Sequence, residues 1–272
     1  MRRWRRAVLV TGIFMSACLF SPALANALAQ AVSIPALRVL AGWTGAVAYP
    51  VIGLLLALLI ALACLIRPRI LSTTLALVIL FNFLWYPLCL SDPQTAPPAT
   101  SDAVFALCSE LVSDLNANGR QTISVQDALA RSKDVMHAPA SAKAVRYPEW
   151  MRKLHIAGIF VPFTGEALVD TTRSAVATPF TAAHELAHMM GIADEAAANY
   201  AAYVACTDYG GAFAYSARLW ALRYALARVE NPGEVIRALD AGIQSDLSSI
   251  PSVTGVDGDY GNVVDMLAAN PS

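Results

Sequence analysis

Two histidines and a glutamate in the second half of the chain have the residue types and the spacing of a metal site. His184 and His188 lie four residues apart in the stretch AAHELAHMMG, and Glu185 follows the first histidine directly. On a helix, residues four apart lie on one face, so both imidazoles can reach the same point. This His-Glu-x-x-His pattern is typical of zinc hydrolases, in which Zn²⁺ keeps an open position and lowers the pKa of its water to about 7. Glu185 would then be the catalytic general base that takes the proton from that water.

The five-residue pattern also occurs by chance, so its surroundings matter. A helix start precedes it, a glycine follows it closely, and a carboxylate comes next on a new helix. The motif also holds two of only four histidines in the chain. The other two, His137 and His155, have no such neighbours and are expected to be surface or packing residues. These features favour a metal site over coincidence.

A third metal ligand is expected from the helix that follows the motif. Glu195 comes seven residues after His188, beyond a glycine turn that can fold it back over the histidines. Asn199 lies four residues later on the same face, where it can hydrogen-bond a ligand histidine or Glu195 itself. Asp194 competes as a ligand, but its position suits a helix cap. Three more distant acids also stay open as ligands: Asp208, Asp257 and Asp265.

The motif must lie on a helix that begins and ends close to it. Thr178 is a cap residue followed by a proline at the first helical position, which predicts a helix over 178–190. Gly191 ends that helix. Asp194 then caps a helix that runs to about residue 207.

Further helices and one short β segment complete the predicted elements. β-Forming residues interrupted by glycine and proline predict one or two short strands within 155–170. Ser101 is the expected N-cap of a helix that stops at Gly119. Other helices are expected at 124–136, at 212–230, from 231 onward and at 260–270. The predicted class is therefore mainly α with a short β segment.

Two other stretches have groups that could contact a substrate. An upstream edge strand can pair with an extended peptide, so Phe160–Glu166 is one hypothesis for a substrate strand, with Glu166 taking part. The alternative is a structural turn set by Gly165, in which Glu166 is a salt-bridge partner. Tyr260 and Tyr215 are hypotheses for polarising a scissile carbonyl or stabilising an oxyanion, and the alternative for each is a packed aromatic.

The first third of the chain has the composition of a membrane domain. The mean hydropathy of the whole chain is +0.51, and no Asp or Glu occurs before Asp92. Three long runs carry no charge: residues 7–37, 39–66 and 70–91. Each exceeds the roughly 20 residues that cross a bilayer core. We therefore expect three transmembrane helices, near 7–27, 44–66 and 70–90. The segment 1–27 also fits a signal peptide, with Ala23-Leu24-Ala25 as the cleavage site.

Basic residues predict the orientation of these spans. Loops rich in Lys and Arg favour the cytoplasmic side. The first span is preceded by MRRWRR at residues 1–6, and the second and third spans are joined by a loop with Arg67 and Arg69, so both of these places should be cytoplasmic. Arg38, between the first and second spans, would lie on the other side. The domain after the spans would then lie outside the cytoplasm.

A linker rich in Pro, Thr and Ala at 91–102 separates the membrane part, 1–90, from a domain at 103–272. From residue 92 onward the chain has 12 basic and 20 acidic residues, a formal charge of −8. Phosphate contacts need clustered Lys and Arg, so nucleic acid is excluded as an expected partner.

Four segments resemble, in order, an uncharacterised bacterial family: GIFVPFTGEALVD, PFTAAHELAHMMGIADEAAANYAAYVAC, FAYSARLWALRYAL and YGNVVDMLAA. Its members have N-terminal transmembrane helices and a C-terminal HExxH domain presumed to be a zinc-dependent peptidase. The family usually shows an E-x-E-A-N pattern after the glycine. Here Glu195 matches the first glutamate and Asn199 the asparagine, but Ala197 replaces the second glutamate.

The resemblance implies a multi-pass protein of the bacterial inner membrane with an extracytoplasmic, zincin-like metallopeptidase domain. Zn²⁺ would be held by His184, His188 and Glu195, with Glu185 as the base. The substrate would be a peptide or protein of the cell envelope, with membrane lipid as a second partner. The alternative from another class is a non-catalytic scaffold or sensor with a structural zinc site, which would have no use for Glu185.

Overall fold

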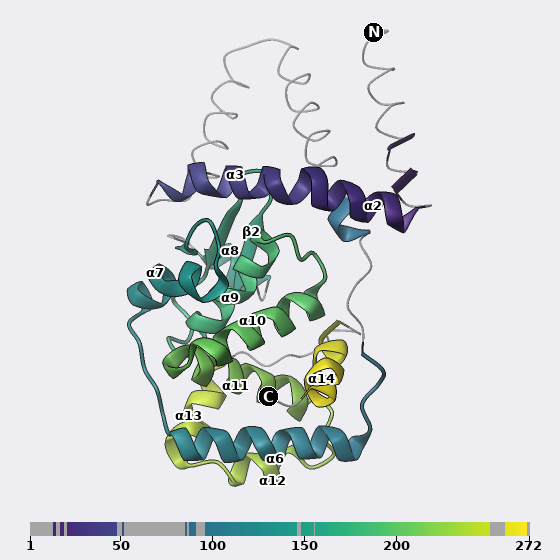
Figure 1. Ribbon diagram of the computed structural model, residues 1–272. Coiled ribbons are helices and arrows are strands. Elements are labelled where there is room, and N and C mark those ends of the chain that lie inside the picture. The colour runs from purple at the N-terminus through teal and green to yellow at the C-terminus, as the bar shows by residue number, and fades with distance from the viewer. Residues whose placement is uncertain are drawn as a thin grey trace, which may run out of the picture.

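The computed structural model describes most residues after 95 and part of the N-terminal third (Figure 1). The described residues are 13–14, 17–18, 21–47, 51, 85, 87–90, 96–145, 148–154, 156–250 and 259–270. Within them the chain is mainly helical with one small sheet, as the sequence predicts.

Two consecutive helices at the centre of the fold contain the motif. α9 (Thr178–Met189) packs against α7 (Val125–Met136), α11 (Gly211–Leu226) and the sheet, and α10 (Glu195–Tyr209) folds back along it. Every residue of α9 except His184 is buried. The alanines around the motif follow from this burial, because small side chains let neighbouring helices approach closely.

A three-stranded sheet lies beside α9. β2 (Gly158–Val161) pairs antiparallel with β3 (Glu166–Val169), and β1 (Lys143–Ala144) pairs parallel with the other side of β3. α8 (Glu149–Lys153) lies between β1 and β2 in the sequence. β3 is therefore the central strand and is buried throughout, while β2 is an edge strand in the described part of the chain.

The remaining helices form the end of the molecule farthest from the sheet (Figure 1). They pack with α11 around the larger of two hydrophobic cores, in which Phe213, Leu219 and Leu222 are fully buried. These helices are α6 (Ser101–Asn118), α12 (Pro232–Arg237), α13 (Ala241–Ser249) and α14 (Asp259–Ala269). The helices predicted at 101–118, 124–136, 212–230, 231 onward and 260–270 are thus present with small shifts in their ends.

A long helix near the N-terminus lies flat across the opposite end (Figure 1). It runs through α2 (Pro22–Leu28), the π-helical turn η1 (Ala29–Ser33) and α3 (Ile34–Gly45) without a break. We call it the crossing helix. Its inner face is buried at every fourth residue: Ala25, Ala29, Ser33, Leu37 and Ala41.

The predicted spans coincide only in part with what the structure describes. The described residues leave out most of the second and third predicted spans, 44–66 and 70–90, and the first half of the first, 7–27. Within those residues, one helix, Pro22–Gly45, is long and apolar enough to cross a membrane by length and composition. It overlaps only the end of the first predicted span. Residues 28–43, expected to connect two spans, are helical because their inner face packs on the later domain.

The second hydrophobic core joins the N-terminal third to the later domain. Leu37 and Leu88, from before the predicted linker, pack in one cluster with Phe160, Leu186 and Met189. The described part of 1–90 and the domain after the linker therefore share a core.

Two predicted helix caps are displaced by one residue. Thr100, rather than Ser101, caps α6, and its Oγ1 accepts a hydrogen bond from the backbone N–H of Ala103 at 3.2 Å. Thr178 is not the N-cap of α9, because a turn precedes the helix and Ala177 is the N-cap. The Thr178 hydroxyl instead donates to the carbonyl of Ser174. In contrast, Asp194 caps α10 as predicted, accepting from Ala197 N at 2.7 Å.

Candidate metal centre

The two histidines of the motif face one point from the same side of α9. Their rings are 4.7 Å apart between centroids and nearly perpendicular, and the two Nε2 atoms are 3.2 Å apart. The two nitrogens are within hydrogen-bond distance of each other, so one small ion could contact both. His188 is buried, whereas His184 is the one residue of α9 with appreciable exposure.

The turn after α9 brings the third group to the same point. Gly191 has a φ of 98°, and its N–H bonds the carbonyl of His188 while that of Ile192 bonds the carbonyl of Ala187. This pair of bonds is a Schellman motif, which needs a residue in the left-handed region and therefore favours glycine. The turn reverses the chain, so that Glu195 begins α10 directly over the histidines.

The three groups bring their ligand atoms within 4.8 Å of one another, and each carboxylate oxygen of Glu195 faces a different histidine. Glu195 Oε2 is 3.2 Å from His184 Nε2, and Glu195 Oε1 is 3.4 Å from His188 Nε2. In a tetrahedral zinc site with bonds of 2.0–2.2 Å, neighbouring ligand atoms lie about 3.3–3.4 Å apart. The shortest separations, 3.2–3.4 Å, are of this size, with one oxygen of Glu195 on each histidine, and two imidazoles with one carboxylate suit zinc. The donor set therefore fits Zn²⁺.

The protonation state of one ligand follows from its other nitrogen. His188 Nδ1 lies 2.6 Å from the carbonyl oxygen of Ile192, which can only accept. Nδ1 must therefore carry the hydrogen, and in the neutral ring this leaves the Nε2 lone pair directed at the cluster. The Schellman turn thus both returns Glu195 and orients His188.

The electrostatics of the cluster favour an ionised glutamate. Burial raises the pKa of Glu195, but hydrogen bonds from His184 and His188 outweigh burial and hold that pKa below its usual range. Burial lowers the pKa of His188, but Glu195 and Glu185 outweigh burial and raise it. Glu195 is therefore an anionic ligand, and a cation at this point would meet two imidazole nitrogens and one anionic oxygen.

Glu185 is outside the triangle and faces the edge strand. It is 4% exposed, and its carboxylate packs directly on Gly158 of β2. Burial raises its pKa, although the charges of His184 and His188 lower it in part. A buried carboxyl with a raised pKa beside a cluster of titratable groups suits proton transfer.

Two residues near the cluster were not expected from the sequence. The Trp85 ring lies 6.4 Å from the ring of His188 and 5.5 Å from that of Phe160, between centroids. Trp85 carries no catalytic signal in the sequence, where it reads as an interfacial aromatic. Gly158 has only the weak signal of a glycine inside a strand, which can mark a close approach of another group.

Asn199 and Glu166 take structural places instead of contacting the ligands. Asn199 is buried, and its Oδ1 accepts from the Tyr224 hydroxyl at 3.3 Å. Its predicted hydrogen bond to a ligand is absent among the described contacts. Glu166 lies in the central strand, 2.8 Å from Lys143 Nζ and 2.8 Å from Thr164 Oγ1. The alternative of a salt-bridge partner is therefore the right one, and Glu166 is not on the strand edge.

The predicted oxyanion tyrosines and the distant acids are not brought to the cluster by the described structure. Tyr260 lies in α14, and its side chain is outside the described residues. Tyr215 is buried and donates to Asp246 Oδ2 at 2.6 Å. Asp265 pairs with Arg228, and Asp257 lies outside the described residues.

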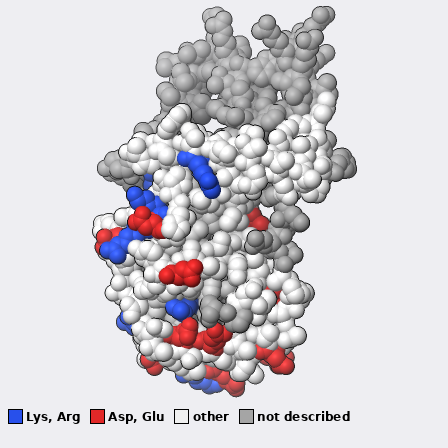
Figure 2. Space-filling view, viewed as in Figure 1, with Lys and Arg blue, Asp and Glu red and all other residues white. Residues whose placement is uncertain are grey.

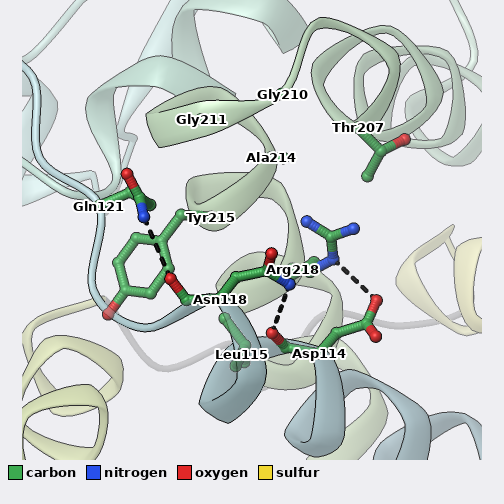
Figure 3. Close-up of a pocket in the computed structure, with 10 residues that line it drawn as sticks. All are labelled: Asp114, Leu115, Asn118, Gln121, Thr207, Gly210, Gly211, Ala214, Tyr215 and Arg218. Atoms are coloured by element: carbon green, nitrogen blue, oxygen red, sulfur yellow. Dashed lines mark hydrogen bonds and ion pairs between the residues drawn. The ribbon is translucent and has the colours of Figure 1, made fainter.

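Two hollows lie away from the ligand atoms. A groove of about 800 Å³ runs between the crossing helix, α7 and α10, and reaches Ile192 and Asp194 next to the cluster. A polar pocket of about 290 Å³ lies between α6 and the start of α11 (Figure 3). In Figure 3, Arg218 is paired with Asp114 across this second pocket. The two charged residues that line this pocket, Asp114 and Arg218, are therefore already paired with each other.

Comparison with known proteins identifies a family but no characterised relative. Residues 36–265 match the model of a family described as a protein of unknown function (DUF3810). No curated protein and no solved structure matches the chain. The matched range contains α9, α10 and the whole ligand cluster.

Proposed function

The chain belongs to the DUF3810 family, whose description assigns no function, and we propose from the geometry of the cluster that the protein is a membrane-anchored, zinc-dependent metallopeptidase. The observation that carries the proposal is the triangle of His184, His188 and Glu195 with zinc-like separations, beside the buried carboxyl of Glu185. The localisation we propose is a bacterial inner membrane, with this domain on the extracytoplasmic side.

The number of ligands supports a catalytic rather than a structural zinc. Structural zinc sites are usually closed by four protein ligands, whereas catalytic sites have three and keep one position open. Among the described residues the cluster consists of His184, His188 and Glu195 alone. When bound, zinc would supply a Lewis acid that polarises a carbonyl and acidifies a water.

Two groups of this chain would transfer the proton and orient a metal ligand. Glu185, with its raised pKa, would accept a proton from the attacking water and donate it to the leaving amine. The Ile192 carbonyl holds the ring of His188 in one orientation, so the ligand geometry does not have to form at each turnover.

The edge strand supports a peptide as substrate. No strand pairs with the side of β2 that does not face β3 within the described part of the chain, and an extended peptide can add there as a further strand. The backbone of Phe160 in β2 hydrogen-bonds the Glu185 carboxylate, so the strand and the base are in direct contact. Glu185 packs on Gly158 of this strand, so a peptide on β2 would pass beside the base. This moves the substrate-strand hypothesis from Phe160–Glu166 to Gly158–Val161.

The proposal is tested with Glu185→Gln, which keeps the shape of the side chain but cannot take a proton. The zinc-loaded full chain in detergent is incubated with a complex peptide mixture, and new termini are read by mass spectrometry. Wild type should cleave, and Glu185→Gln should keep its zinc while losing about 10²–10⁴-fold in rate. Glu234→Gln, at an exposed position of α12, is the matched control and should cleave like wild type.

Cleavage by Glu185→Gln at the wild-type rate would exclude Glu185 as the base. A zinc-loaded wild type that cleaves nothing would favour the non-catalytic scaffold or sensor.

A further inference from the structure

The outer face of the crossing helix is apolar and exposed. Of the eleven large hydrophobic residues that are exposed in the described part of the chain, five lie in or just after this helix. They are Leu24, Val32, Val39, Trp43 and Val47, and Trp43 is 74% exposed. The only charged residue between 21 and 47 is Arg38, which is also exposed. Figure 2 shows that the described surface at this end is almost without charge, in contrast to the opposite end.

The inner face of the same helix is bound tightly to the domain. A Cβ placed on Gly165 would lie 2.7 Å from the backbone nitrogen of Ala41, so the helix and the strand turn touch backbone to backbone. A Cβ on Gly191 would overlap the side chain of Ile34. The Thr44 hydroxyl donates to the carbonyl of Thr164 at 2.9 Å. The crossing helix is therefore a fixed layer of the domain.

This packing argues against a bilayer crossing by the crossing helix, although its length allows one. A spanning helix is surrounded by lipid or by other spanning helices, and the polar loops and sheet that α3 covers cannot lie in hydrocarbon. A helix with one apolar outer face, one protein-bound face and a basic residue instead has the properties of an interfacial helix that lies in the membrane plane.

The chain enters and leaves an apolar segment at this same end of the molecule. The Val51 N–H donates to Glu166 Oε1 at 2.7 Å, and the Trp85 ring packs on Phe160, so both residues lie at the strands that α3 covers. The 33 residues between them have no acid, and their only charges are Arg67 and Arg69. Arg67 and Arg69 divide this segment into two uncharged, apolar runs of 15 residues each.

We propose that the outer face of the crossing helix rests on the surface of a lipid bilayer. Trp43 suits the level of the headgroups, and Arg38 suits their phosphates. Leu24, Val32 and Val39 would reach the boundary of the acyl chains, as in other in-plane helices.

This placement sets the distance of the metal centre from the membrane. α3 packs on α9 and on β3, and packed helices have axes 8–10 Å apart. The ligand atoms on α9 would thus lie outside the bilayer, on the order of 10–20 Å from its surface. An extended chain of about 3–6 residues covers that distance. If the proposed peptidase activity holds, its substrates are the membrane-proximal segments of envelope proteins.

The placement is tested with two labelled positions of matched exposure. Val39 on the crossing helix is 52% exposed, and Phe105 on α6, at the opposite end, is 53% exposed. Val39→Cys or Phe105→Cys is introduced in the full chain with the exposed Cys89 changed to Ser, and labelled with a small fluorophore. The protein is reconstituted in phosphatidylcholine–phosphatidylglycerol vesicles. The labelled parent without the new cysteine gives the background.

A label at 39 should be quenched severalfold more strongly by nitroxide-labelled lipid than a label at 105, and severalfold less by aqueous iodide. Equal quenching at the two positions, or a label at 39 that only iodide reaches, would overturn the proposal. A second readout uses no new cysteine: brominated lipid should quench the native fluorescence less in Trp43→Phe than in wild type. Both readouts need neither zinc nor cleavage, so the membrane placement and the proposed function can fail separately.

Discussion

Replacing Gly158 with alanine tests how closely Glu185 is held against the edge strand. A Cβ at this position would lie 2.7 Å from Glu185 Cγ and 2.8 Å from its Cδ. Carbon atoms in contact are normally about 3.5–4.0 Å apart, so the carboxylate must move by roughly 1 Å. A displacement of about 1 Å of a catalytic group costs roughly 10²-fold in rate.

The fold should tolerate this change. The backbone of Gly158 does not have a positive φ, and the side chain in the way is flexible. The assay measures zinc per chain, the midpoint of thermal unfolding and the rate of peptide cleavage. We expect unchanged zinc, a similar midpoint and a cleavage rate about 100-fold lower. Gly233→Ala is the matched control, because nothing lies within 4 Å of a Cβ there and its φ is not positive.

Two results would refute the reasoning. Wild-type cleavage by Gly158→Ala would mean that the position of Glu185 does not matter for the reaction. Loss of zinc in Gly158→Ala would mean that the strand supports the ligands instead of the base.

Two further substitutions test buried polar contacts of the fold. Lys143→Met leaves the buried carboxylate of Glu166 without its cation. A denaturant titration should show a free energy of unfolding about 3–5 kcal/mol lower than in wild type. An unchanged free energy would contradict a structural ion pair. Asp246→Asn weakens the buried hydrogen bond from Tyr215 and should cost about 1–3 kcal/mol at neutral pH. Burial raises the pKa of Asp246, but bonds from Arg120 and Tyr215 outweigh burial and lower it below 3.8. The stabilisation by ionised Asp246 is therefore present above pH 3.8 and is lost as the pH falls through the lower pKa of the folded state. The difference in unfolding free energy between wild type and Asp246→Asn should thus shrink only below about pH 4. A difference that already shrinks between pH 7 and pH 5 would contradict this assignment.

The ligand geometry is predictable from the sequence because every step in it is local. The spacing of His184 and His188, the positive-φ glycine at 191 and the cap at Asp194 are all read within twelve residues. Together they determine where Glu195 arrives. Short-range rules of helix geometry and capping are enough for that part of the site.

The residues missed by sequence reasoning act through contacts that are distant along the chain. Gly158 matters because a side chain 27 positions later packs on it. Trp85 approaches His188 from across the predicted linker. The sequence left Glu166 open between a substrate strand and a salt bridge. Its strand, β3, is central because β1 pairs with it, and a two-residue strand such as Lys143–Ala144 has no recognisable sequence pattern.

The crossing helix was missed for a related reason, because residues 28–43 were expected to connect two spans. Hydropathy alone does not separate a connecting segment, or a helix in lipid, from a helix in the membrane plane. The difference lies in the buried row from Ala25 to Ala41, which appears only when the partner surface is known.

The measurement that tests the central claim most directly is zinc per chain in the purified full-length protein. We predict about one zinc in wild type, its loss in His188→Ala and in Glu195→Ala, and its retention in Asp208→Ala, an exposed acid on the same helix as Glu195. Zinc retained in Glu195→Ala would show that the third ligand is another residue. A wild type that takes up no zinc when supplied with it would contradict the metal centre itself.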